Sequence, residues 1–227
     1  MNQPGYTKRL FSAPTAGVKS IMGKINHVDK QTDNRFLNMY HVDATSVHNT
    51  QVNYFVASRA EQVSDLKMIT RKNRPDGVAI YSLYGEKHDK VVLIRQFRYP
   101  IGDYIYEFPA GLVEKGEDCT ECAVRELKEE TGLTLHPVKA PAGYERPFFT
   151  TVGLTDESCA TVFGYAEGEI TNIGEEASEE IEVVLADRQE IRRILKEENV
   201  ALICAYMLMH FLHDEDPFAF LEGGEEA

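Results

Sequence analysis

The sequence predicts an α/β fold, in which short strands and helices share a chain of 227 residues. Two observations support this. Between positions 76 and 186, six short runs have the β-branched and aromatic composition that is typical of strands. One helical pattern lies among these runs, and two more follow them. The predicted strands cover residues 77–83, 90–97, 105–108, 142–144, 158–166 and 181–186.

The N-terminal part of the chain predicts an arm and a hairpin. Residues 1–33 are rich in small and polar types without a clear period, so we expect a flexible N-terminal arm there. Residues 34–75 contain two extended, aromatic-containing runs around a polar turn at 45–50, which predicts a β-hairpin. A two-stranded hairpin is only marginally stable alone, so this segment should pack on another surface.

The rest of the chain predicts one domain over residues 76–214 and a C-terminal tail at 215–227. The domain ends in two predicted helices at 187–197 and 200–213, and Asp187 is a suitable N-cap for the first. The second helix is largely apolar, which indicates packing on the core rather than binding of a ligand.

Composition excludes several classes of function. The net charge of −13 and the pI near 5.0 argue against a nucleic-acid partner or an anionic membrane surface. No apolar run approaches the roughly 20 residues needed to span a bilayer, and no secretory signal is evident. The four cysteines are too few for a disulfide scaffold. We therefore expect a cytoplasmic protein.

Residues 111–133 carry the strongest functional signal. On a helix of about 100° per residue, Glu126, Glu129 and Glu130 share roughly a third of the circumference. Like charges at this spacing cost roughly 0.2–0.5 kcal/mol per pair, and acidic groups near a helix C-terminus oppose its dipole. One interpretation is a solvated acidic face. The other is a site completed by a divalent cation, for which carboxylate oxygens favour Mg²⁺ or Mn²⁺.

The spacing within this stretch resembles a known family. Gly111, Glu117 and the run from Arg125 to Leu133 match the pattern G-x5-E-x7-R-E-U-x-E-E-x-G-U, where U is a bulky aliphatic residue. This is the Nudix box of the Nudix hydrolases, which cleave a diphosphate linked to a further group. The resemblance implies a Nudix fold: an α/β/α sandwich with a mixed, curved sheet, here preceded by an N-terminal β arm.

The resemblance also implies roles for individual residues. Arg125 would hold a glutamate in place, and Glu129 would bind a further metal or orient water. Gly111 and Gly132 would shape the loops on either side of the helix, the second as a C-cap. The implied ligands of Mg²⁺ are the Ala110 carbonyl and the carboxylates of Glu126, Glu129 and Glu130.

A narrower resemblance is to the ADP-sugar pyrophosphatases. Residues 96–98 read Q-F-R and residues 107–111 read E-F-P-A-G, as in that branch, and Pro147 follows the box at a typical distance. Residues 152–157 are similar to the branch's P-G-[FLY]-[ST]-[DN]-E loop, with Val152 in place of the proline. The implied activity is hydrolysis of a nucleoside diphosphate sugar, with ADP-ribose the leading substrate. The alternatives are UDP-glucose or another nucleotide sugar, and a non-catalytic sensor of such ligands.

In that branch, substrate is held by residues inside and outside the box. Arg98 would bind phosphate, although a surface ion pair is an alternative role. Phe36 and Tyr54 would stack on the nucleobase, one from each subunit of a homodimer, although they could instead be core aromatics. Arg59 and Leu112 complete the expected substrate-binding set.

The branch often takes its general base from an acidic loop outside the box. The matching stretch here is 174–181, whose several glutamates leave the register ambiguous. By comparison with related chains we favour Glu180, then Glu179, then Glu176.

Overall fold

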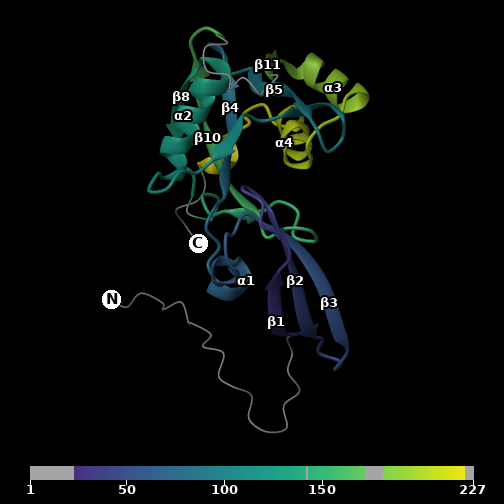
Figure 1. Ribbon diagram of the computed structural model, residues 1–227. Helices are drawn as coiled ribbons and strands as arrows, with labels where there is room; N and C mark the ends of the chain where they lie inside the picture. Colours follow the sequence, from purple (N-terminus) through teal and green to yellow (C-terminus); the bar gives the residue numbers. More distant parts are fainter. Residues whose placement is uncertain (1–22, 142, 172–180, 223–227) are drawn as a thin grey trace, which may run out of the picture. The chain divides into compact units, whose positions relative to one another are not determined.

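The computed structural model describes residues 23–141, 143–171 and 181–222. The chain divides into two compact units, drawn in Figure 1. The N-terminal unit consists of Met1–Thr70 and Gly153–Asp156, and the main unit consists of Arg71–Val152 and Glu157–Ala227. No helix within the described residues is long and apolar enough to cross a membrane.

The N-terminal unit contains a three-stranded antiparallel sheet with the order β1-β2-β3. Strands β2 (Asn38–Thr45) and β3 (Gln51–Ser58) form a hairpin. Strand β1 (Lys24–Lys30) pairs with β2. A 3-10 turn, η1 (Val63–Asp65), and a short helix, α1 (Lys67–Thr70), follow β3.

The described part of the predicted flexible arm at 1–33 therefore contains a strand, and that part of the prediction is wrong. Strand β1 lies at the edge of the sheet and buries only Val28, so it lacks the apolar alternation by which strands are recognised. One face of the sheet carries the small core of this unit. Its buried members are Val28, Tyr40, Val42, Val56 and Leu66.

The main unit is built on a mixed sheet whose central order is β11-β5-β4-β10-β8. Strands β4 and β10 are parallel, whereas β4 with β5, β5 with β11, and β10 with β8 are antiparallel. Three short strands extend it: β6 pairs with β5, β7 with β4, and β9 with β10. The strands are β4 (Gly77–Tyr84), β5 (Lys90–Arg98), β6 (Asp103–Glu107), β7 (Ala110–Leu112), β8 (Thr134–Val138), β9 (Phe148–Phe149), β10 (Ser158–Glu167) and β11 (Ile181–Ala186).

Helices cover both faces of this sheet, as Figure 1 shows within the main unit. Helix α2 (Cys119–Thr131) buries Ala123 and Leu127 against β4, β8 and β10. Helices α3 (Arg188–Glu197) and α4 (Leu202–His213) cover the opposite face. The predicted α/β class is confirmed, including the N-cap at Asp187, whose carboxylate accepts two backbone N–H groups of α3.

One predicted strand is misplaced. Residues 143 and 144 lie in a turn, whereas β8 occupies 134–138. The sequence of β8 contains Pro137, which has no N–H for a ladder and therefore argues against a central strand. Strand β8 lies at the edge of the sheet, where proline is tolerated.

The structure also corrects the predicted C-terminal tail at 215–227, because the described residues 215–222 include a folded turn. A 3-10 turn, η2 (Ala219–Leu221), holds Phe218 and Leu221 against the core on the α4 side. The Phe218 ring meets Tyr81 and Phe163 edge-on, with centroids 5.4 and 5.9 Å apart. The folded part of the main unit therefore continues beyond the predicted boundary at 214.

Replacement of Phe218 by alanine should therefore lower the free energy of unfolding by about 3–5 kcal/mol, the cost of emptying a buried aromatic site. Chemical denaturation of the whole chain measures it. Tyr206→Ala is the matched control, because Tyr206 is 65% exposed and its loss should change the free energy by under about 1 kcal/mol. Equal effects of the two substitutions would show that the segment after α4 does not belong to the core.

Candidate active site

The ends of helix α2 are fixed by its own sequence. At the start, the Asp118 carboxylate accepts the N–H groups of Thr120 (2.8 Å) and Glu121 (2.9 Å), and Glu121 accepts the N–H of Asp118 in return. This capping box satisfies donors that the helix itself leaves unpaired. At the other end Gly132 adopts a φ of +76°, a left-handed conformation that favours glycine. Because both ends of the helix are fixed, the directions of the side chains of residues 125–130 are fixed as well.

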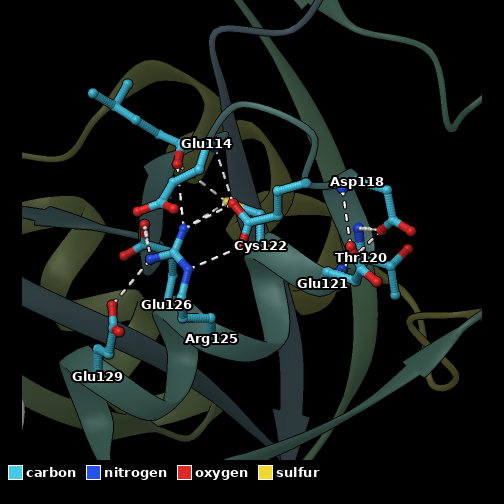
Figure 2. Close-up of polar contacts among 10 residues, drawn as sticks. Glu114, Asp118, Thr120, Glu121, Cys122, Arg125, Glu126 and Glu129 are labelled. Atoms are coloured by element: carbon cyan, nitrogen blue, oxygen red, sulfur yellow. Dashed lines mark hydrogen bonds and ion pairs between the residues drawn. The ribbon is translucent and has the colours of Figure 1, made fainter.

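Arg125 lies between three glutamates, two of which are labelled with it in Figure 2. Its Nε and Nη2 donate to the two carboxylate oxygens of Glu117, at 2.9 and 3.0 Å. Its Nη1 donates to Glu126 (2.8 Å) and Glu129 (3.0 Å). One guanidinium thus holds three carboxylates, which offsets part of their mutual repulsion.

These contacts change the acidity of the groups involved. The hydrogen bonds from Arg125 lower the pKa of Glu117 to about 2. Burial raises the pKa of Glu126, although the hydrogen bond from Arg125 opposes the shift, and the negative charge of Glu129 adds to it. A cation near Glu126 would favour its ionised form.

Gly111 makes room for the carboxylate of Glu126. A Cβ atom at position 111 would lie 1.8 Å from Cδ and 2.0 Å from Oε1 of Glu126, distances that no real side chain tolerates. The Glu126 carboxylate therefore lies directly against the backbone of β7. This is the physical reason for a glycine at the first position of the box.

Substitution of Gly111 by alanine should displace Glu126 and lower turnover by about tenfold or more, because small misplacements of reacting groups are costly. Steady-state kinetics measure the loss. Gly116→Ala does not serve as a control, since Gly116 has a φ of +92°. Gly143→Ala does, because no atom lies within 4 Å of a Cβ built there. Near-normal turnover in Gly111→Ala would show that the position of Glu126 is unimportant.

Glu130 joins Glu126 beside β7. It is 8% exposed, and its Oε2 accepts the N–H of Ala110 at 3.1 Å. Glu129 differs from both, because its side chain is half exposed. Two predicted ligands are thus brought against the strand that carries Ala110, and the third remains on the outer side of the helix.

This donor set suits a hard divalent cation, since every candidate donor is a carboxylate or carbonyl oxygen. Within the described residues, however, no group of three or more His, Cys, Asp or Glu side chains is gathered closely enough to hold a metal ion. The carboxylates of Glu126 and Glu129 are instead paired with the guanidinium group of Arg125. Nudix hydrolases generally use divalent metal ions.

The predicted substrate-binding residues lie in both units. In the main unit, Arg98 forms an ion pair with Glu107 (2.6 Å), and Leu112 is half exposed at the end of β7. In the N-terminal unit, Phe36 and Tyr54 are 64% and 43% exposed, so their alternative role as core aromatics is wrong. Arg59 follows the end of β3 in the same unit.

The base candidates, the partner of Arg98 and the cysteines remain to be compared with the sequence predictions. Glu176, Glu179 and Glu180, the candidates for the general base, lie outside the described residues. The partnership of Glu107 with Arg98 was not predicted, although Glu107 belongs to the E-F-P-A-G motif. The cysteines at 119, 122, 159 and 204 are all free.

Comparison with known proteins decides the family. A model of the NUDIX domain matches residues 73–204, which contain the box, α2 and the central strands. The chain belongs to this family. The Nudix membership predicted from the box is thereby confirmed.

Individual Nudix relatives resemble shorter parts of the chain. "ADP-sugar pyrophosphatase" of Mus musculus is 44% identical over 70 residues, or 30% of this chain and 32% of that protein. "ADP-ribose pyrophosphatase" of Bacillus subtilis (strain 168) is 39% identical over 83 residues, or 37% and 42%. The chain thus spans less than half the length of these curated relatives.

A solved structure supports the fold of this Nudix protein. The "Crystal structure of ADP compounds hydrolase" aligns with a TM-score of 0.60 and 18% identity, covering 85% of this chain and 92% of that chain. Together with the family match, it confirms the predicted Nudix fold with its mixed sheet between helices.

Proposed function

We propose that this Nudix protein is a Mg²⁺-dependent hydrolase that cleaves the pyrophosphate bond of a nucleoside diphosphate sugar, with ADP-ribose its leading substrate. The observation that carries the proposal is the placement of Glu126 and Glu130 against β7 by an intact box whose Arg125 holds three glutamates. The printed names of the mouse and Bacillus subtilis relatives support the class of substrate.

Different residues of the chain would bind the cation and orient the attacking water. Glu126 and Glu130, with the Ala110 carbonyl, would hold the cation, and Glu129 would hold a further cation or orient water. When bound, the cation neutralises phosphate charge and polarises the bond that breaks. Mn²⁺ suits the same oxygen ligands.

The substrate would be positioned by the chain's own side chains. Arg98 offers phosphate oxygens a planar fork of donors, and its ion pair with Glu107 restricts its rotamers before substrate arrives. Phe36 and Tyr54 would stack on the base, with Arg59 and Leu112 nearby in the bound complex. Water then attacks one phosphorus, a glutamate takes its proton, and the products are AMP and ribose 5-phosphate.

A panel of substrates tests the proposal against its alternatives. Release of phosphomonoester is measured with ADP-ribose, UDP-glucose, GDP-mannose and NADH, each with Mg²⁺. We expect the highest kcat/KM with ADP-ribose. A preference for UDP-glucose would identify another sugar-nucleotide pyrophosphatase, and binding of ADP-ribose without cleavage of any compound would identify a sensor.

We also propose that the enzyme is a cytoplasmic homodimer. Phe36 and Phe55 of the N-terminal unit are 64% and 56% exposed, and exposed aromatic side chains of this kind would suit contact with a second subunit. The free cysteines suit a reducing compartment.

Deletion of residues 1–70 should therefore abolish both dimerisation and nucleotide-sugar binding, because it removes the three strands of the N-terminal unit. Light scattering gives the mass of the particle, and calorimetric titration with ADP-ribose gives the affinity. The full-length chain is the control. A truncated protein that remains a dimer, or a monomer that retains full activity, would contradict the expected role of this unit.

A further inference from the structure

The first residue of β4 approaches the backbone of β7 too closely to carry a side chain. A Cβ atom built on Gly77 would lie 2.7 Å from the carbonyl oxygen of Gly111, and real Cβ atoms essentially never come within 3.0 Å of such an atom. The φ of Gly77 lies outside the left-handed region, so alanine could adopt this backbone conformation. The close contact with β7, rather than the conformation, is therefore what requires a glycine at position 77.

Gly77 lies between two neighbouring strands. On one side it pairs with Leu112 of β7, and on the other with Cys159 of β10, whose Sγ would lie 3.7 Å from the added Cβ. Directly before it, the Asp76 carbonyl accepts the N–H of Val113 at 3.1 Å. Because both edges of β4 are paired here, a methyl group on Gly77 cannot be accommodated without a shift of backbone.

Strand β7 in turn supports the box carboxylates. The N–H of Ala110 donates to Oε2 of Glu130 at 3.1 Å. The backbone of Gly111 lies directly against the carboxylate of Glu126. A displacement of β7 would therefore move the backbone groups on which both carboxylates rest, together with the Ala110 carbonyl that is expected to face the cation.

We propose that Gly77 is a positioning residue, whose lack of a side chain lets β7 lie close to β4 and thereby sets the position of Glu126 and Glu130. The catalytic consequence rests on the proposed function. All of these residues belong to the main unit. A purely structural glycine would behave differently, because its replacement would weaken the fold without changing the affinity of the folded protein for a cation.

Gly164 supplies a matched control in the same sheet. A Cβ atom built there would lie 2.7 Å from the carbonyl oxygen of His136, so β10 approaches β8 as closely as β4 approaches β7. Neither β8 nor β10 carries a predicted metal ligand. Alanine at Gly77 and alanine at Gly164 thus press the same methyl group on a neighbouring carbonyl, but only the first does so beside the box carboxylates.

The experiment compares full-length Gly77→Ala and Gly164→Ala with wild type, at a temperature at which circular dichroism shows all three to be folded. Amide hydrogen exchange without metal is followed in peptides covering 108–114 and 134–138. Binding of Mn²⁺ alone is titrated by electron paramagnetic resonance, and kcat is measured with ADP-ribose and Mg²⁺.

In Gly77→Ala we expect exchange at 108–114 to be about threefold or more faster. We also expect Mn²⁺ to bind about tenfold or more weakly, and kcat to fall by about tenfold, because the supports of the ligands have moved. In Gly164→Ala we expect faster exchange only at 134–138, with Mn²⁺ affinity and kcat within about twofold of wild type.

Three results would overturn the inference. Unchanged exchange at 108–114 in Gly77→Ala would show that the methyl group does not displace β7. Faster exchange there with normal Mn²⁺ affinity and normal kcat would show that the box is independent of β4. Equal losses of affinity in the two variants would show that Gly77 has only the structural role that Gly164 has.

A second variant covers a failure of Gly77→Ala to fold. Asp76→Ala adds no atom and removes the hydrogen bond from the Ser158 N–H to Oδ2 of Asp76 (2.9 Å), which holds the start of β4. The same expectations and the same contradictions then apply to it. If wild type hydrolyses no nucleotide sugar, the proposed function fails, while the exchange at 108–114, which needs neither substrate nor metal, still tests the positioning.

Discussion

Replacement of Glu130 by glutamine is expected to lower turnover at saturating Mg²⁺ by about 100-fold or more, the scale lost with one preorganised charge-stabilising group. Glutamine keeps the volume of the side chain, and its amide oxygen can still accept the N–H of Ala110. The substitution therefore removes a charge from the predicted cation site and can keep this hydrogen bond.

Two measurements accompany this prediction. Thermal unfolding without metal should show a fold at least as stable as wild type, because one of several like charges has been removed. Glu197→Gln, at the exposed end of α3, should leave turnover unchanged. Activity of Glu130→Gln within a factor of about three of wild type would show that Glu130 is no metal ligand.

The second large effect should come from the general base. One of Glu180→Gln, Glu179→Gln and Glu176→Gln is expected to lower kcat by about 10²–10⁴-fold, with little change in substrate affinity. Below its pKa a carboxylate base is protonated and cannot take a proton from water, so wild-type activity should fall at acidic pH. The variant that lacks the base should lose this acidic limb of the pH–rate profile.

Glu175→Gln, in the same acidic stretch, is the matched control and should keep wild-type turnover. Near-normal turnover in all three test variants would place the base elsewhere. Glu129 would then be the best remaining candidate, because it lies on α2 beside Glu130 and its side chain is half exposed.

The sequence predicted the parts of the molecule that depend on local pattern. Gly132 was expected as the C-cap of the box helix and has that role, and the buried runs of β4, β5 and β10 have strong strand composition. Strand β1 and edge strand β8 were missed because they lack apolar alternation or contain proline.

Long-range partnerships could not be predicted in the same way. The bond between Tyr54 and Gly153 joins residues 99 positions apart, and the ion pair between Arg98 and Glu107 depends on the register of β5 with β6. The clash that would follow a side chain at Gly111 depends on how α2 packs beside β7. Such contacts are properties of tertiary packing, which a single sequence does not display.

Under the proposed function, the intact box hydrolyses a nucleotide sugar rather than merely binding it. Phosphorus NMR of ADP-ribose, followed with the full-length protein and Mg²⁺, tests this most directly. We expect the pyrophosphate signals to disappear and to be replaced by those of AMP and ribose 5-phosphate, and we expect a chelator to stop the reaction. Pyrophosphate signals that broaden on binding but persist over time would contradict it.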